Sequence, residues 1–205
     1  MLLPFSERSK RWESKAFGLS RLADIGPYEH LDPWKLAPNL RLTVLDGSAA
    51  LRNLSESNQR HLLGKGRFSW SGGVYPKPLP DGTFICILNP THSKRRNKVT
   101  LMEEIAHSYL NHKPSGLRLL EDGLEVREYD KAQEQEAYGV GAAALLPWAT
   151  FFPLVNSGRT IEQLAGHYDV TPDLISYRIK ITGAFRIYQA RQRSPSLPQR
   201  KTVWG

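Results

Sequence analysis

The chain has 205 residues, 40% of them hydrophobic, which is enough for one substantial core and predicts a single domain. Its 28 basic residues outweigh 20 acidic ones, and the formal charge of +8 favours acidic partners, nucleic acid among them. The single cysteine, Cys86, argues against a disulfide framework, and the early charges near Met1 argue against a secretory signal. We therefore expect a cytoplasmic protein.

The organisation along the chain follows from charge and periodicity. We expect a peripheral basic arm over residues 1–26, one folded domain over 27–185, and a basic, disordered tail over 186–205. The uncharged stretch 137–155 approaches the length of a membrane span, but glycines and prolines interrupt it. We expect no membrane partner.

The sequence of the first half of the domain predicts a small sheet with two short helices. A short helix is expected at 31–37, where Asp32 suits the N-cap and Pro33 the first helical position. A second short helix at 58–63 stops at Gly64. Strands are predicted at 40–45, 67–75 and 83–88, the last apolar on both faces and therefore buried.

The second half predicts helices. Residues 131–146 form a helix rich in glycine and alanine, and such small residues allow a neighbouring helix to approach closely. A helix pair is expected at 160–183, where Thr160 opens a capping box and Thr171 caps the second helix. The fold class is therefore α+β, with a small, mostly antiparallel sheet and a C-terminal helix pair.

The helix expected at 99–112 carries the candidate chemistry. Glu103 and His107 are four residues apart, so both project from one side, as two ligands of one metal ion must. Glu104 occupies the general-base position of the motif His-Glu-x-x-His, in which Glu103 replaces the first histidine. The simpler interpretation is a solvated acidic helix start with a core histidine.

A catalytic zinc site needs a third protein ligand. The best candidate is Glu136, on the small-residue helix that we expect to pack against residues 99–112. Glu134 is the rival, and because it lies two positions away on a helix, the two carboxylates point in different directions.

These motifs and their order resemble the ImmA/IrrE metallo-endopeptidases. That family has a strand ending in Leu-Asn, a helix with His-Glu-x-x-His and a trailing histidine, and then Glu-Ala-Asn before a small-residue helix ending in Leu-x-Pro. The resemblance covers residues 31–183. Its counterparts here are Leu88-Asn89, the run from Glu103 to His107, His112, Glu136-Ala137-Tyr138 and Leu145-Leu146-Pro147.

The resemblance implies a zincin-like core that hydrolyses a peptide bond in a partner protein, often a helix-turn-helix repressor. It implies Zn²⁺ as the cofactor, with Glu103, His107 and Glu136 as metal ligands and Glu104 as the general base. Tyr138 would donate to the oxyanion, or His112 would hold a ligand in place. The strand 83–88 would pair with the substrate if one of its edges were free.

Two features keep other functions open. Two carboxylate ligands shift metal preference toward Mn²⁺ or Fe²⁺ and weaken water activation, which allows a weak or inactive pseudo-peptidase. The helix pair also has helix-turn-helix spacing, and the basic tail would meet phosphates, which allows DNA binding. The groove-facing residues would then be Asp173, Ser176, Tyr177 and Lys180.

Overall fold

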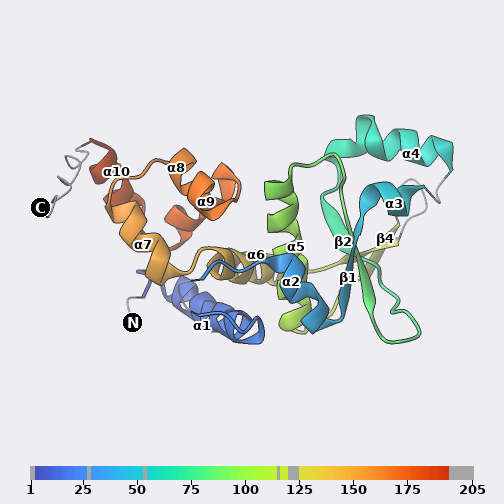
Figure 1. Ribbon diagram of the computed structural model, residues 1–205, viewed down its shortest axis with the longest axis horizontal. Helices are drawn as coiled ribbons and strands as arrows, with labels where there is room; N and C mark the ends of the chain where they lie inside the picture. Colours follow the sequence, from blue (N-terminus) through green and yellow to red (C-terminus); the bar gives the residue numbers. More distant parts are fainter. Residues whose placement is uncertain (1–2, 27–28, 53–54, 115, 120–124, 194–205) are drawn as a thin grey trace, which may run out of the picture.

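The computed structural model describes residues 3–26, 29–52, 55–114, 116–119 and 125–193 (Figure 1). A small sheet lies at one end, α7–α10 lie at the other, and α1, α5 and α6 run between them. The mixed α+β class is confirmed. The elements are α1 (Glu7–Leu22), α2 (Pro33–Leu36), η1 (Ala37–Leu40), β1 (Leu42–Asp46), α3 (Gly47–Leu51), α4 (Glu56–Leu63), η2 (Lys65–Phe68), β2 (Gly72–Val74), β3 (Phe84–Leu88), α5 (Lys94–Tyr109), β4 (Gly116–Leu119), β5 (Glu125–Glu128), α6 (Lys131–Leu145), α7 (Trp148–Asn156), α8 (Ile161–Tyr168), α9 (Pro172–Ile181) and α10 (Phe185–Arg193).

The main sheet has three strands in the order β1-β3-β2, and β4 pairs with β5 in a separate two-stranded sheet. β3 runs parallel to β1 and antiparallel to β2, so the main sheet is mixed. The predicted strand at 83–88 forms the central strand β3, but only its Cys86 and Leu88 face is buried, whereas Ile85 and Ile87 on the other face are half-buried. Because β1 and β2 flank β3 on both sides, the free edge on which substrate pairing depended is absent from β3.

Close helix packing is confirmed for the small-residue helix α6. A Cβ atom added at Gly141 would lie 3.2 Å from the backbone oxygen of Met102 on α5. One added at Gly139 would lie 2.4 Å from the ring of Trp12 on α1. The glycines of α6 therefore allow two helices to approach it, one on each side.

α1 differs from the expected peripheral arm. Ser6 caps it by accepting a hydrogen bond from the backbone N–H of Ser9. Its apolar side chains Trp12, Ala16 and Leu19 are buried in the core. The mixed charges of this segment concealed an amphipathic pattern, because small residues occupy part of the buried face.

The local signals for the helix pair are confirmed. Both hydrogen bonds of the Thr160 capping box form at the start of α8, and Thr171 caps α9. Among the described residues, no single helix is long and apolar enough to cross a membrane, although α6 and α7 together pass such a test across a 73° bend. Residues 186–193, which we expected to belong to a disordered tail, instead form most of α10. The rest of that expected tail, residues 194–205, lies outside the described part of the chain.

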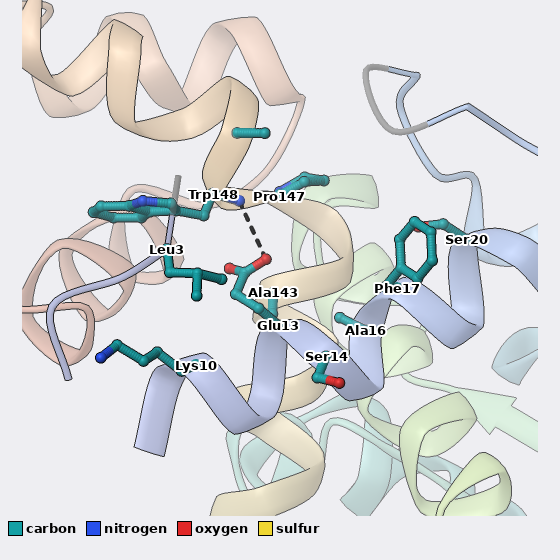
Figure 2. A pocket seen from close by; sticks show the side chains of 11 residues that line it. Leu3, Lys10, Glu13, Ser14, Ala16, Phe17, Ser20, Ala143, Pro147 and Trp148 are labelled. Atoms are coloured by element: carbon teal, nitrogen blue, oxygen red, sulfur yellow. Dashed lines mark hydrogen bonds between the residues drawn. The ribbon is translucent and has the colours of Figure 1, made fainter. Parts of the chain in front are cut away.

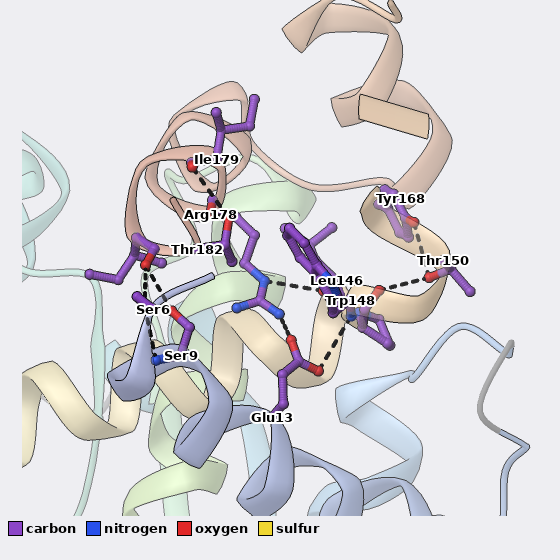
Figure 3. A network of polar contacts seen from close by, with 12 residues as sticks. Ser6, Ser9, Glu13, Leu146, Trp148, Thr150, Tyr168, Arg178, Ile179 and Thr182 are labelled. Atoms are coloured by element: carbon purple, nitrogen blue, oxygen red, sulfur yellow. Dashed lines mark hydrogen bonds and ion pairs between the residues drawn. The ribbon is translucent and has the colours of Figure 1, made fainter. Parts of the chain in front are cut away.

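A buried ion pair joins the first helix to the C-terminal pair (Figure 3). Arg178 on α9 is fully buried and pairs with Glu13 on α1. The Arg178 Nε–H also donates to the backbone oxygen of Leu146 at 3.2 Å. Glu13 accepts from the backbone N–H of Trp148 at 3.3 Å, so the pair also holds the junction between α6 and α7.

A cavity of about 450 Å³ lies beside this junction (Figure 2). Phe17 and Leu3 line it together with Ala143, Pro147 and Trp148, and Glu13 contributes a polar group. α1 therefore takes part in three features: the packing against α6, the buried ion pair and this cavity.

Candidate functional site

α5 is longer at its start than expected and shorter at its end. Ser93 caps it by accepting from the backbone N–H of Arg96, so the basic residues expected in a loop form the first turns. The helix ends at Tyr109, and Asn111 adopts a left-handed conformation with φ of 54°. This turn brings the backbone N–H of His112 to within 3.0 Å of the carbonyl oxygen of His107.

His107 lies at the centre of the site. Its side chain is 3% exposed, and the ring of Tyr129 stacks on it with centroids 3.9 Å apart. Its Nε2 faces the carboxylate of Glu134, with Oε1 at 3.9 Å. The structure therefore brings α5 and α6 together at His107 and Glu134.

Two further acidic residues lie near His107 and Glu134. Glu103 and Glu104 are half-buried on α5. Burial, followed by the charges of Glu104 and Glu134, raises the pKa of the Glu103 carboxyl to about 8. Glu103, Glu104, His107 and Glu134 are called the α5–α6 cluster below.

Glu136 lies elsewhere. Its Oε1 is 2.5 Å from Nζ of Lys15 on α1, and its Oε2 is 3.3 Å from Nε2 of His112. The hydrogen bond from Lys15 is the main reason why the pKa of Glu136 lies below its ordinary value. As expected from helix geometry, the two acids point apart, but the one that faces His107 is Glu134, the rival.

His112 connects the two groups. Its Nδ1 lies 3.1 Å from Nδ1 of His107, and its side chain is 7% exposed. Burial is the main cause that lowers the pKa of His112. Glu136 thus reaches His107 only through His112.

Two tyrosines lie near the cluster. Tyr138 on α6 packs edge-on against Tyr177 on α9, with ring centroids 4.7 Å apart. Burial, followed by the charge of Glu103 in the case of Tyr138, raises the pKa of both hydroxyls to about 12. Both hydroxyls therefore keep their protons at neutral pH and can donate hydrogen bonds.

Sequence reasoning missed Lys15 and Tyr129, and gave Tyr177 a role at a DNA groove. Lys15 and Glu136 are 121 positions apart, so no local pattern connects them. The signal that could have found the contact is steric: Gly139 leaves room for Trp12, and this packing brings α1 alongside α6.

The nitrogen and oxygen atoms of the α5–α6 cluster are of the types that bind divalent cations, but their positions do not form a complete site. An imidazole nitrogen and carboxylate oxygens are common ligands of such ions, and the excess negative charge of the cluster calls for a cation. In the described part of the chain, no three His, Cys, Asp or Glu side chains already converge on one point. The fit therefore rests on the His107–Glu134 pair and on the acids beside it.

Comparison with known proteins supports one family. No curated protein matches the chain. The sequence profile of the IrrE N-terminal-like domain, a peptidase family, matches residues 71–180, which is more than half of the chain. The match extends from just before β2 almost to the end of α9 and contains the whole α5–α6 cluster. With Glu103 where the family motif has its first histidine, this protein belongs to the ImmA/IrrE family.

Proposed function

We propose that the protein is a metal-dependent endopeptidase with a zincin-like catalytic core. One observation carries the proposal: Nε2 of His107 and Oε1 of Glu134 face each other at 3.9 Å across two packed helices. Metal–ligand bonds of about 2.0–2.2 Å allow one ion to contact both atoms.

The proposed ligand set is His107, Glu134 and Glu103, of which His107 and Glu134 already face each other. Glu134 takes the place that sequence reasoning gave to Glu136, because the oxygens of Glu136 already contact Lys15 and His112. One imidazole and two carboxylates fit Zn²⁺, and the harder oxygen ligands also suit Mn²⁺ or Fe²⁺.

The surrounding residues suit peptide hydrolysis. A divalent ion at this site would polarise the scissile carbonyl and lower the pKa of water. The Glu104 carboxylate accepts a proton from the attacking water and passes it to the leaving amine. Tyr138, protonated because its pKa is about 12, donates a hydrogen bond to the oxyanion that develops on the substrate.

We infer that the substrate is a protein, and that it is a helix-turn-helix transcriptional repressor. The family assignment supports a peptidase core, and the repressor follows from the resemblance in motif order that the sequence carries. The proposal places the reaction in the cytoplasm, where such repressors act.

The alternative, an inactive regulator that binds DNA through α8 and α9, receives less support. Tyr177, expected to face a groove, packs against Tyr138 instead. Asp173 is exposed near the start of α9, where it would repel phosphates. Ser176 and Lys180 are exposed on the same helix, and they are the residues that a DNA complex would use.

Metal analysis combined with a cleavage assay tests the proposal. The purified protein should bind one divalent ion per chain and cleave a purified repressor encoded beside its gene. Glu104→Gln should keep the ion and lose cleavage by at least about 100-fold, the usual scale of general-base catalysis. His107→Ala should lose both.

The same assay compares the two rival acids. Glu134→Gln should weaken metal binding more than Glu136→Gln, because the first removes a ligand and the second a more distant group. A wild-type protein without metal and without cleavage would contradict the proposal, and salt-sensitive binding to duplex DNA by that protein would favour the alternative.

A further inference from the structure

A continuous line of polar contacts runs from α1 to the α5–α6 cluster. Lys15 Nζ contacts Oε1 of Glu136 at 2.5 Å, and Oε2 of Glu136 contacts Nε2 of His112 at 3.3 Å. Nδ1 of His112 contacts Nδ1 of His107 at 3.1 Å. Beyond them, Nε2 of His107 faces Glu134.

The chemistry of each atom sets the direction of the hydrogen bonds. An ionised carboxylate only accepts, so Glu136 must receive the proton on Nε2 of His112. A neutral His112 then has a lone pair on Nδ1, which can only accept from the Nδ1–H of His107. His107 is left with its lone pair on Nε2, directed at the place where a ligand atom is needed.

The contact at the start of this line agrees with the scheme. The ammonium of Lys15 can only donate, and Oε1 of Glu136 accepts from it at 2.5 Å, as an ionised carboxylate does.

We propose that Lys15, Glu136 and His112 are positioning residues that fix the His107 tautomer in which Nε2 is free to bind a metal. The inference rests on the proposed metal-binding role of His107. It also extends the site beyond the family match at residues 71–180, because Lys15 belongs to α1. Outer partners of metal-bound histidines commonly have this effect.

A surface ion pair would not explain the arrangement. The side chains of Lys15 and Glu136 are 43% and 34% exposed, and an exposed pair of this kind contributes little to stability. His112, in contrast, is almost fully enclosed, so its hydrogen bonds have no competition from bulk water. Lys15 therefore acts by orienting Glu136.

The substitution Glu136→Gln tests the proposal because it should reverse the tautomers of both His107 and His112. The ammonium of Lys15 needs an acceptor and holds the amide oxygen, so the amide NH₂ must face His112. Nε2 of His112 then becomes an acceptor, its Nδ1 carries the proton, and His107 is forced into the Nε2–H tautomer. Both histidines therefore exchange tautomers.

The ¹⁵N chemical shifts of the imidazoles report these tautomers in the full-length chain, as purified and after treatment with a chelator. Spectra are recorded above the ordinary titration range of histidine, near pKa 6.5. The wild type should show Nδ1–H at His107 and Nε2–H at His112, and Glu136→Gln should show the reverse. Nε2–H at His107 in the wild type, or no exchange in Glu136→Gln, overturns the proposal.

Lys15 is tested in the Glu136→Gln background. Adding Lys15→Met frees the amide to rotate, so both tautomer pairs should be populated. Adding Lys10→Met instead, which removes a lysine of the same helix that pairs with Glu7, should leave the reversal complete. Full reversal in the Lys15→Met double variant would show that Lys15 has no orienting role.

Zinc affinity, measured by competition with a chelator, provides a second readout. Glu136→Gln should bind Zn²⁺ about 10–100-fold more weakly than the wild type, because the Nε2–H tautomer must first be reversed. Unchanged affinity would contradict the proposal. A wild type with the expected tautomers that binds no divalent ion contradicts the proposed peptidase function but not the hydrogen-bonded chain, so the two failures can be told apart.

Discussion

Glu103 is the residue that most changes the chemistry of this site relative to the family motif. A histidine here would be a neutral ligand, whereas a carboxylate adds negative charge beside Glu104 and Glu134. Burial of the Glu103 carboxyl, followed by the charges of Glu104 and Glu134, raises its pKa to about 8, so this group holds a proton at neutral pH. A metal ion bound by Glu103, as proposed, would have to displace this proton.

The raised pKa of Glu103 makes stability depend on pH. The ordinary pKa of Glu103 is 4.5, so between that value and about 8 the folded state binds more protons than the unfolded state. In chelator, the free energy of unfolding should therefore fall as the pH rises through this range and become constant above it. Glu103→Gln should remove the fall and stabilise the protein near pH 8 by about 2 kcal/mol.

Urea denaturation across this pH range measures the effect. Glu162→Gln, which changes an exposed acid on α8, is the matched control and should leave the pH dependence as in the wild type. Saturating divalent metal should also reduce the fall, because the ion replaces the proton. Equal pH dependence in the wild type and Glu103→Gln would show that Glu103 is ionised at neutral pH.

At the scale of elements, the position of α6 depends on two glycines, which have no side chain. Gly139 faces the ring of Trp12, and Gly141 faces the backbone of Met102, so α1 and α5 both approach this helix closely. The same packing carries Lys15 to Glu136 and places Glu134 opposite His107. The site therefore depends on contacts between backbones as much as on its polar residues.

Gly139→Ala tests this dependence. Its Cβ would lie 2.4 Å from the Trp12 ring, which is too bulky to move aside, so α1 must shift. Overpacking of this kind should destabilise the protein by about 1–3 kcal/mol and also weaken the contact of Lys15 with Glu136. Chemical denaturation measures the first effect, and the histidine ¹⁵N spectra of the Gly139→Ala/Glu136→Gln double variant measure the second.

Gly166→Ala is the matched control for helix propensity. Gly166 lies in α8 with nothing within 4 Å of an added Cβ, so the same substitution should stabilise by about 0.5–1 kcal/mol. If both alanine variants stabilised the protein, Trp12 would not pack against α6 as described.

Sequence reasoning succeeded where the cause is local. The caps at Asp32 and Thr160 depend on a few adjacent residues, and both form. The parallel pairing of β1 with β3 was missed because it joins segments about 40 residues apart through backbone atoms that every sequence has. The sequence alone could not decide between Glu134 and Glu136 for a related reason. The two acids lie about half a helical turn apart, and only the packing of α5, α6 and α1 determines that Glu134 faces His107.

At the scale of the molecule, the Glu13–Arg178 ion pair connects the parts that flank the site. Glu13 belongs to α1, which supplies Lys15, and Arg178 belongs to α9, which supplies Tyr177 beside Tyr138. Ser6 and Ser9 reinforce the connection by donating to the backbone oxygen of Ile181 at 2.8 Å. The C-terminal helices are therefore held against α1.

Removing one partner of this pair should be far more costly than removing both. Burial disfavours the charged form of Arg178 and lowers its pKa, and Glu13 is the acid that compensates the charge. Glu13→Ala leaves a buried, uncompensated guanidinium and should destabilise the protein by about 3–5 kcal/mol. Adding Arg178→Met removes that charge, so the double variant should regain more than about 1 kcal/mol, a coupling expected of contacting residues. Urea denaturation of both single variants and the double variant measures this coupling, and strictly additive losses would mean that the two charges do not interact.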